Sequence, residues 1–282
     1  MKTINVSELT QNIKEMCIEA NHCLTPDMDC ALRNAAVTEK SPLGRQILNQ
    51  LQDNLQIAGD DMIPICQDTG MAVIFMEIGQ DVHFEGGNLQ DAVNEGVRQG
   101  YAEGFLRKSV VKDPLLRENT KDNTPAVIHY EMTAGDSVKI TVAPKGFGSE
   151  NMSRVFMLKP ADGIEGVKNA VLTAVKDAGP NACPPMVVGV GVGGTFEKCA
   201  LLAKKALTRP VDQRSDIPYV KEMEEELLEK INRTGIGPGG LGGTTTALAV
   251  NITTYPRQPS CSAHHLRNCV EITCTCYFYT IP

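Results

Sequence analysis

The stretch NACPPMVVGVGVGGTFEKCALLAKKAL, residues 181–207, decides the fold class. It opens as a loop with two prolines, and the run MVVGVGV then predicts a buried strand that ends at a glycine turn. Apolar residues recur at helical spacing from about 196 to 207. A strand followed directly by a helix indicates that sheets and helices pack together in this chain.

Outward from this stretch, helices and strands alternate loosely. Helical apolar spacing and capping residues predict helices over 6–20, 41–56, 88–105, 164–178, 196–207 and 218–233. Continuous apolar runs predict strands at 71–79 and 247–255, and the segments AVIHYEM (126–132) and SVKITVA (137–143) flank TAGD, a hairpin signal. A hairpin breaks a strict βαβ rhythm. We therefore expect a mixed α/β (α+β) fold, with helices around mixed β-sheets, and not a doubly wound one.

The composition is that of a water-soluble globular protein. The 282 residues are 42% hydrophobic and 22% charged, and they include no Trp, so Val, Ile, Leu, Ala and Met must fill the core. The net charge of −7, without a cluster of Lys and Arg, argues against nucleic-acid binding. The opening residues lack the apolar segment of a signal peptide, and no run approaches the ~20 apolar residues of a membrane helix. We expect a cytoplasmic protein with no membrane span.

Two glycine-rich segments raise the possibility of nucleotide binding. Gly189, Gly191 and Gly194 satisfy the G-x-G-x-x-G pattern, but the first two alternate with valines inside the expected strand. No clear acidic residue closes a second strand about 20 residues later. A closely packed strand and turn is the favoured interpretation over a dinucleotide site. The later segment GPGGLGGTTT lacks the Lys of a phosphate-binding loop, although its N–H groups can face a carboxylate or a cluster sulfide.

Ten cysteines, without a secretion signal, favour reduced thiols, metal ligands or core residues over disulfides. Cys66 lies in the polar loop IPICQDTG, and Cys183 lies in the loop NACPP; such loops are where ligands and nucleophiles occur. A structural role for either thiol remains the alternative. No His is placed as the base of a Cys nucleophile, and no C-x-x-C pair suggests zinc. Iron–sulfur ligands, in contrast, need not be close in sequence. The remaining cysteines before residue 200 are interpreted as core or surface thiols: Cys17, Cys23, Cys30 and Cys199.

Five motifs in order carry a resemblance to a known family. They are PICQDTG, LRKSVVKDPL, APKGFGSENMSR, the stretch 181–207 and GIGPGGLGGTTTALAVNITTYP. Together they resemble the alpha subunit of the class I iron–sulfur fumarate hydratase and L-tartrate dehydratase family, from about residue 4 to Pro256. The resemblance implies a hydro-lyase that reversibly dehydrates a 2-hydroxy dicarboxylate, malate to fumarate or tartrate to oxaloacetate. It further implies a [4Fe–4S] cluster with one open iron, and a beta subunit that completes the active site in a hetero-oligomer.

The resemblance also implies roles for residues in the matched motifs. Gln67 and Asp68 match substrate-contacting positions, and Asp68 is a candidate for proton transfer; the structural alternative for Asp68 is the cap of an Asx-type turn. Arg107 matches an arginine that pairs with a substrate carboxylate, a task for which its planar fork is suited. Gly146 matches a backbone contact to substrate, with Lys145 beside it as a weaker candidate.

The cluster ligands implied by the resemblance are Cys66, Cys183 and a third cysteine near the C-terminus. The family pattern stops after Pro256, so we expect one hydro-lyase domain over 1–256 and an atypical tail over 257–282. Gln258 stands where the family has His, and an abrupt change of composition suggests a frame change or an altered gene end. By distance from Tyr255, Cys269 is nearest to the expected third ligand. The other cysteines of the tail remain alternatives for that position: Cys261, Cys274 and Cys276.

Two other functions stay open at this point. If the altered tail has lost the third ligand, the chain would be a cluster-less subunit for assembly or regulation. The other alternative is a nucleotide-binding oxidoreductase domain, which would bind a dinucleotide and no iron.

Overall fold

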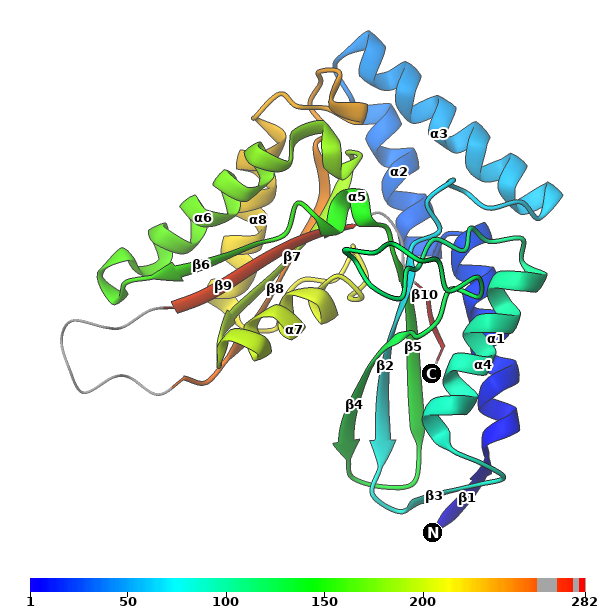
Figure 1. Cartoon of the computed structure of the whole chain (residues 1–282). Coiled ribbons are helices and arrows are strands. Elements are labelled where there is room, and N and C mark those ends of the chain that lie inside the picture. The colour runs from blue at the N-terminus through cyan, green and yellow to red at the C-terminus, as the bar shows by residue number, and fades with distance from the viewer. Residues whose placement is uncertain (258–267, 276–278, 282) are drawn as a thin grey trace. The chain divides into compact units, whose positions relative to one another are not determined.

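The structure, a computed structural model, describes residues 1–257, 268–275 and 279–281, and the side chains of residues 1–257 (Figure 1). The chain forms two compact units. The first unit comprises 1–25, 53–147 and the strand 279–281; the second comprises 26–52, 148–257 and 268–275. Helices and mixed sheets occur in both units, which confirms the expected mixed α/β class. In the described part of the chain no helix is both long and apolar enough to cross a membrane.

The first unit contains a four-stranded sheet packed against two helices, together with a short two-stranded parallel sheet formed by its first and third strands. Its elements are β1 (Lys2–Asn5), α1 (Val6–His22), β2 (Met71–Gly79), β3 (Val82–Glu85), α4 (Leu89–Glu103), β4 (Val127–Thr133), β5 (Val138–Lys145) and β10 (Tyr279–Ile281). Asn5 and Asn88 cap α1 and α4 with side-chain oxygens that accept backbone N–H groups. Apolar residues of α1, α4, β2 and β5 form one continuous core, and α1 lies beside α4 (Figure 1).

The predicted hairpin of β4 and β5 is wrong. The strand order is β10-β5-β2-β4, so β2 lies between the two strands and pairs parallel with β4 and antiparallel with β5. The turn between them bonds instead to the end of β2, where Gly79 N donates to Ser137 O at 2.8 Å. Because β2 is the most continuously buried strand of this sheet, it takes the central place.

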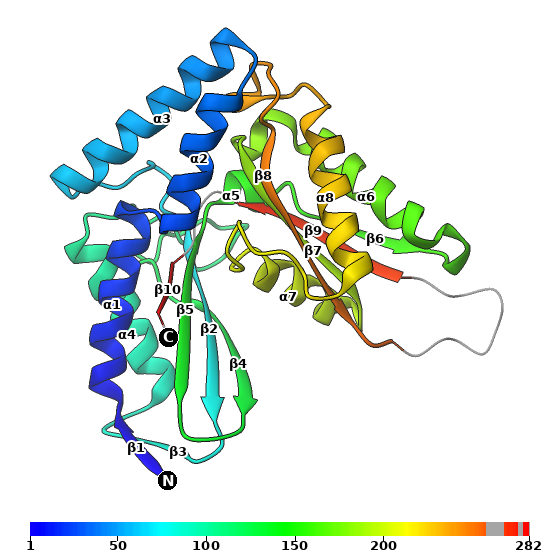
Figure 2. The ribbon, with the colours of Figure 1, turned by 180° about the vertical axis from the view of Figure 1, so that it is seen from behind.

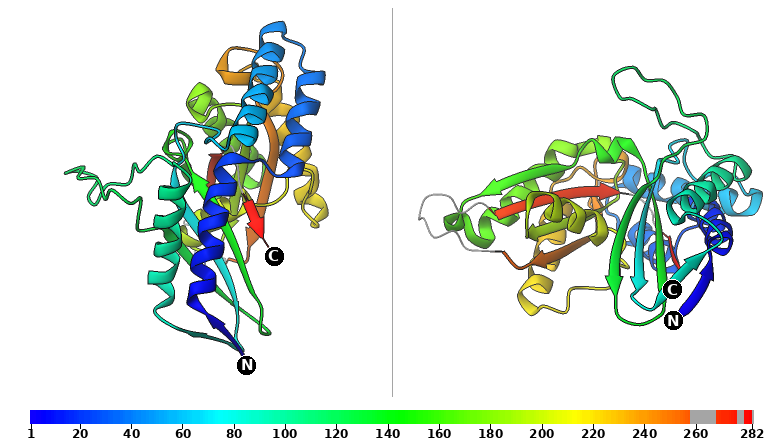
Figure 3. Two further views of the ribbon diagram at one scale, coloured as in Figure 1. Left: turned by 90° about the vertical axis from the view of Figure 1, so that its right-hand side faces the viewer. Right: turned by 60° about the horizontal axis from the view of Figure 1, so that its bottom comes forward.

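Between α4 and β4 the chain makes a long excursion that contains no helix or strand. Figure 3 shows this segment extending beyond α4. Its apolar side chains Phe105, Leu115 and Leu116 are more than four-fifths exposed. The excursion passes through Arg107 near its start and returns through Asn123, and both residues belong to the site described below.

The second unit is a four-stranded sheet, of order β6-β9-β7-β8, with helices on both faces. Its elements are α2 (Pro26–Thr38), β6 (Arg154–Leu158), η1 (Pro160–Asp162), α6 (Gly163–Ala178), η2 (Gly179–Ala182), β7 (Met186–Gly193), α7 (Phe196–Ala206), α8 (Pro218–Asn232), η3 (Pro238–Gly240), β8 (Ala247–Tyr255) and β9 (Asn268–Thr275). Two further helices cross the division between the units along the chain: α3 (Pro42–Asp61) and α5 (Phe147–Glu150).

Strand β7 has two different faces, and these explain its glycines. Met186, Val188 and Val190 point into a core shared with α6 and α8. On the opposite face a Cβ at Gly189 would lie 2.3 Å from Ala203 O, so α7 packs directly on the strand backbone (Figure 2). The expectation that these glycines serve close packing is confirmed.

Candidate functional site

Cys66 lies in the loop between α3 and β2, where its side chain and that of Gln67 are exposed. The Cys66 Sγ accepts the Asp68 N–H at 3.4 Å, and its thiol points to Gln67 Oε1 at 3.5 Å. The preceding residue, Ile65, donates its N–H to Asn21 O at 2.8 Å, which ties the loop to the end of α1. The loop therefore presents a thiol and an amide outward from a backbone that is held behind them.

The C-terminal half of this loop is buried and held by hydrogen bonds. The Tyr101 hydroxyl donates to Thr69 O at 2.9 Å and to Gly70 O at 3.1 Å, and the Asn123 amide donates to Gly70 O at 3.1 Å. Tyr101 and Asn123 are both fully buried. Burial raises the pKa of Tyr101 well above its usual value, with a smaller contribution from the negative charge of Asp68. Its hydroxyl therefore keeps its proton and remains a hydrogen-bond donor.

Gly70 is required by its surroundings. Its φ is +68°, and a Cβ there would lie 2.4 Å from the carbonyl carbon of Lys145. A side chain at this position would be strained and would also push β5 away from the loop. The glycine of the QDTG motif thus brings the Cys66 loop against the end of β5, where Gly146 follows.

The carboxylate of Asp68 joins the loop to Gly146. Its Oδ1 accepts the Gly70 N–H at 3.1 Å, which is the Asx-type turn considered as its structural role. Its Oδ2 accepts the Phe147 N–H at 3.1 Å, and a Cβ at Gly146 would lie 3.1 Å from the same oxygen. The Lys145 side chain is buried, with Nζ 3.3 Å from Gly146 O. Each carboxylate oxygen retains a further lone pair for another partner.

The backbone of Arg107 is bonded to Thr69 of the Cys66 loop. Its N–H donates to Thr69 Oγ1 at 2.9 Å, and the Thr69 hydroxyl lies 3.3 Å from Arg107 O, while the Arg107 side chain is exposed. Asn123 accepts the N–H groups of Ser109 and Val110 at 2.8 and 3.0 Å, which fixes the start of the excursion. The first unit thus brings four predicted residues together: Gln67, Asp68, Arg107 and Gly146.

Three residues that support this arrangement were not singled out from the sequence. Thr69 belongs to a recognised motif, but its hydroxyl contact to Arg107 spans 38 residues. Tyr101 carries a signal, since it falls on the inward face of a predicted helix, although its hydroxyl partner is not readable from the pattern. Asn123 carries no signal, because its amide connects segments 53 and 14 residues away.

Cys183 lies in the second unit, directly after η2. Its side chain is exposed and its backbone is left-handed, with φ 53°. Its N–H donates to Pro180 O at 3.0 Å, and the carbonyl of the next residue, Pro184, accepts the Gly239 N–H at 2.8 Å. A non-glycine residue keeps this conformation only when its surroundings hold it. The glycine-rich loop that contains Gly239 is part of those surroundings.

Two of the six described thiols are buried, and the other four are exposed: Cys23, Cys30, Cys66 and Cys183. Cys17 is fully buried, and burial raises its pKa to about 12, so it is inert; Cys199 is also buried. Cys66 and Cys183 are exposed in polar loops, and such accessible soft donors fit an iron–sulfur cluster. In the described residues no three His, Cys, Asp or Glu side chains gather as metal ligands.

The candidate third ligand falls within the tail. Cys269 belongs to β9, paired in register with Met157 of β6, and Cys274 belongs to the same strand. The side chains of both, and the whole of Gln258, Cys261 and Cys276, lie outside the described residues.

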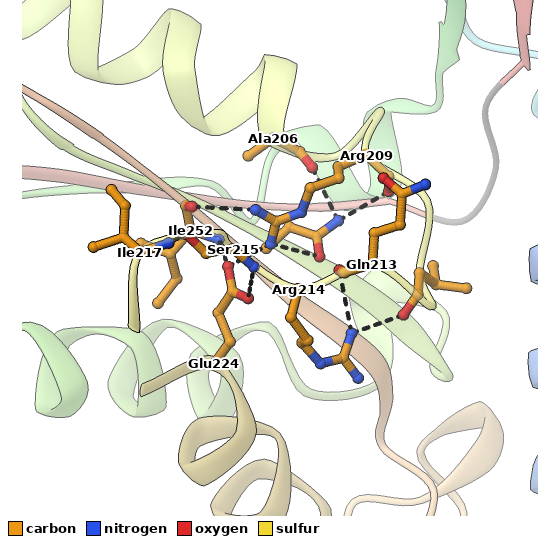
Figure 4. Close-up of polar contacts among 10 residues, drawn as sticks. Ala206, Arg209, Gln213, Arg214, Ser215, Ile217, Glu224 and Ile252 are labelled. Atoms are coloured by element: carbon orange, nitrogen blue, oxygen red, sulfur yellow. Dashed lines mark hydrogen bonds and ion pairs between the residues drawn. The ribbon is translucent and has the colours of Figure 1, made fainter. Parts of the chain in front are cut away.

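A buried ion pair in the second unit has a structural explanation (Figure 4). Glu224, 1% exposed, pairs with Arg209 and accepts the N–H groups of Ser215 at 2.9 Å and Ile252 at 2.8 Å. Arg209 also donates to Asn251 Oδ1 at 3.1 Å. These bonds fix the segment between α7 and α8 on β8, and we assign the pair to folding.

Comparison with known proteins identifies the family to which this chain belongs. The family model described as fumarate hydratase (Fumerase) matches residues 10–277. "Putative L(+)-tartrate dehydratase subunit alpha" of Methanocaldococcus jannaschii is 41% identical over 251 residues, covering 87% of this chain and 88% of the relative. L(+)-tartrate dehydratase subunit alpha of Escherichia coli K12, like that of Shigella sonnei, is 32% identical over 258 residues, covering 90% of this chain and 85% of the relative. The resemblance drawn from the five motifs is confirmed: this chain belongs to the fumarate hydratase family and is a hydro-lyase.

Proposed function

We propose that this chain is the alpha subunit of a cytoplasmic hetero-oligomer that reversibly dehydrates a 2-hydroxy dicarboxylate. Cys66, Cys183 and Cys269 hold a [4Fe–4S] cluster in this proposal. The observation that carries it is the gathering of an exposed thiol, a carboxylate and an exposed arginine around one buried set of hydrogen bonds, in a member of a hydro-lyase family.

The residues of the first unit have complementary tasks. When bound, the cluster supplies a Lewis-acidic iron, which makes a hydroxyl a better leaving group. The Arg107 guanidinium forms a two-pronged pair with a substrate carboxylate, and its fixed backbone sets the reach of that pair. The Gln67 amide donates to a substrate oxygen.

Asp68 is the proposed proton acceptor. Dehydration removes hydroxide from one carbon and a proton from the neighbouring carbon, which together leave as water while a double bond forms. Asp68 takes the proton with a lone pair that its two backbone contacts leave available. Gly146, which has no side chain and lies beside Asp68 Oδ2, lets the substrate approach the backbone.

The names of the relatives support L(+)-tartrate as substrate and a beta subunit as partner. Malate is the other candidate substrate considered. We expect no turnover from the isolated chain, because the partner completes the active site. Co-purification with the beta subunit, followed by parallel assays with L(+)-tartrate and malate, tests both points.

Iron and acid-labile sulfide per chain, measured after anaerobic reconstitution, test the cluster. We expect about four of each in the wild-type chain. Cys66→Ser, Cys183→Ser and Cys269→Ser should each lower both values, whereas Cys30→Ser, which changes an exposed cysteine on α2, should leave them unchanged.

Two results would overturn parts of this proposal. Unchanged iron in Cys269→Ser together with a loss in Cys274→Ser would move the third ligand along β9. Iron absent from a wild-type chain that still binds the beta subunit would identify a cluster-less assembly subunit.

A further inference from the structure

Glu39 is a buried carboxylate at the turn between α2 and α3, and it lies outside every motif discussed above. It is 1% exposed. Its carboxylate accepts the N–H groups of Ser41 at 2.8 Å, Thr244 at 2.8 Å and Thr245 at 2.8 Å, and the Thr244 hydroxyl at 3.0 Å. Burial by itself would raise the pKa of Glu39, but these hydrogen bonds lower it to about 2. An ionised side chain thus binds a loop 205 residues away.

That loop, residues 235–246, is rich in glycine, and it is held both by internal bonds, such as Gly242 N–H to Ile236 O at 2.8 Å, and by Glu39 from outside. Six of its glycines have positive φ: Gly235, Gly237, Gly239, Gly240, Gly242 and Gly243. Glycines give an unfolded or loosened segment many conformations, so a contact from outside the loop helps to select one. Glu39 provides such a contact at short range, since a Cβ at Gly243 would lie 2.9 Å from Glu39 Oε1.

The same loop supports the Cys183 turn at two points. Gly239 donates its N–H to Pro184 O at 2.8 Å, and Thr246 O accepts the Met186 N–H at 3.0 Å. Between these points, a Cβ at Gly240 would lie 2.4 Å from the Cβ of Pro180. A continuous set of contacts within the second unit therefore leads from Glu39, through the loop, to the left-handed Cys183.

We propose that Glu39 is a positioning residue for Cys183, because its carboxylate helps to hold the glycine-rich loop in the shape that supports the Cys183 turn. The inference rests on the proposed function in that Cys183 is a cluster ligand there. Glu39 itself touches neither the thiol nor the substrate; it acts through the backbone bonds of Gly239 and Thr246.

The test compares Glu39→Gln with the wild-type full chain by amide hydrogen exchange, without cluster. Glutamine keeps the size of the side chain and replaces one acceptor oxygen by a donor that faces N–H groups. We expect exchange to accelerate about tenfold both in 236–246 and at the amides of Cys183 and Met186, with no change in 66–79. Glu197→Gln, which alters an exposed carboxylate at the start of α7, is the control and should change neither segment.

A second readout uses the reconstituted protein. Glu39→Gln should retain less iron and, after reduction of the cluster by dithionite, give an altered electron paramagnetic resonance signal, while Glu197→Gln keeps the wild-type signal. If Glu39→Gln does not fold, Thr244→Val removes one donor to Glu39 from an exposed position, and it should accelerate the same amides to a smaller extent.

The outcomes separate this inference from the proposed function. Faster exchange in 236–246 with unchanged exchange at Cys183 would overturn the inference, even if the wild-type chain binds iron. Faster exchange at both, in a chain that binds no iron, would support Glu39 as a positioning residue and overturn the cluster.

Discussion

Replacing Tyr101 by Phe tests whether its hydroxyl holds the Cys66 loop. The substitution removes one O–H that bonds to Thr69 O at 2.9 Å and Gly70 O at 3.1 Å, in a fully buried place. Gly70 O keeps its bond from Asn123, so Thr69 O bears most of the loss. A buried carbonyl that loses its donor costs about 1–3 kcal/mol, and we expect a loss of about 2 kcal/mol in the free energy of unfolding.

Urea unfolding measures this loss. Far-UV circular dichroism follows it, because the chain has no Trp for fluorescence. With a denaturant slope of about 2 kcal/mol per M, the midpoint of Tyr101→Phe should fall by about 1 M. Tyr130→Phe is the matched control, since Tyr130 is 46% exposed on β4, and it should change stability by less than about 0.5 kcal/mol. Equal midpoints for the two variants would refute the assigned role of the Tyr101 hydroxyl.

Three more predictions concern single positions. The pKa of Glu39 falls from 4.5 to about 2 on folding, so the unfolded chain takes up the proton first as pH decreases. The stability advantage of the wild type over Glu39→Gln should therefore be complete above about pH 5 and shrink by about 3 kcal/mol towards pH 2; a difference that does not vary with pH in urea titrations would contradict this. Gly70→Ala places a Cβ 2.4 Å from a backbone carbon and should prevent stable folding, whereas Gly135→Ala, with φ +92° and open space, should cost about 1–2 kcal/mol; thermal midpoints compare them. Glu224→Gln leaves the Arg209 charge without its carboxylate and should cost about 3 kcal/mol in unfolding by urea, and a loss below about 1 kcal/mol would count against a folding role for the pair.

The sequence predicts local features of this fold better than its strand pairing. The helical stripes, the buried run of β2 and the packing glycine Gly189 depend on neighbours in the chain or on periodicity, and the structure confirms them. The β4–β5 hairpin fails because TAGD has the residues of a tight turn, while the pairing depends on where β2 inserts. The sequence pattern indicates the turn, but it does not show that a strand about 50 residues earlier inserts between the two segments.

In the candidate site, too, the sequence indicates the residues within motifs but not those that act on distant parts of the chain. The motif residues Cys66, Asp68 and Arg107 were readable because a resemblance assigns them roles, and those roles remain predictions. Asn123 and Glu39 were not readable, because their amide and carboxylate act on backbone groups that are distant in sequence. A polar residue in a loop looks the same in sequence whether it faces water or is fully buried against another loop.

The insertion of β9 between β6 and β7 has a consequence for the order in which the protein is made. β6 and β7 are synthesised well before residues 268–275, so each waits with an unpaired edge for the strand that they share. The first unit, although it contains the N-terminus, receives its edge strand β10 later still. Residues 268–275 must therefore be made before the second sheet can close, and until then the edges of β6 and β7 that face β9 stay open to other strands.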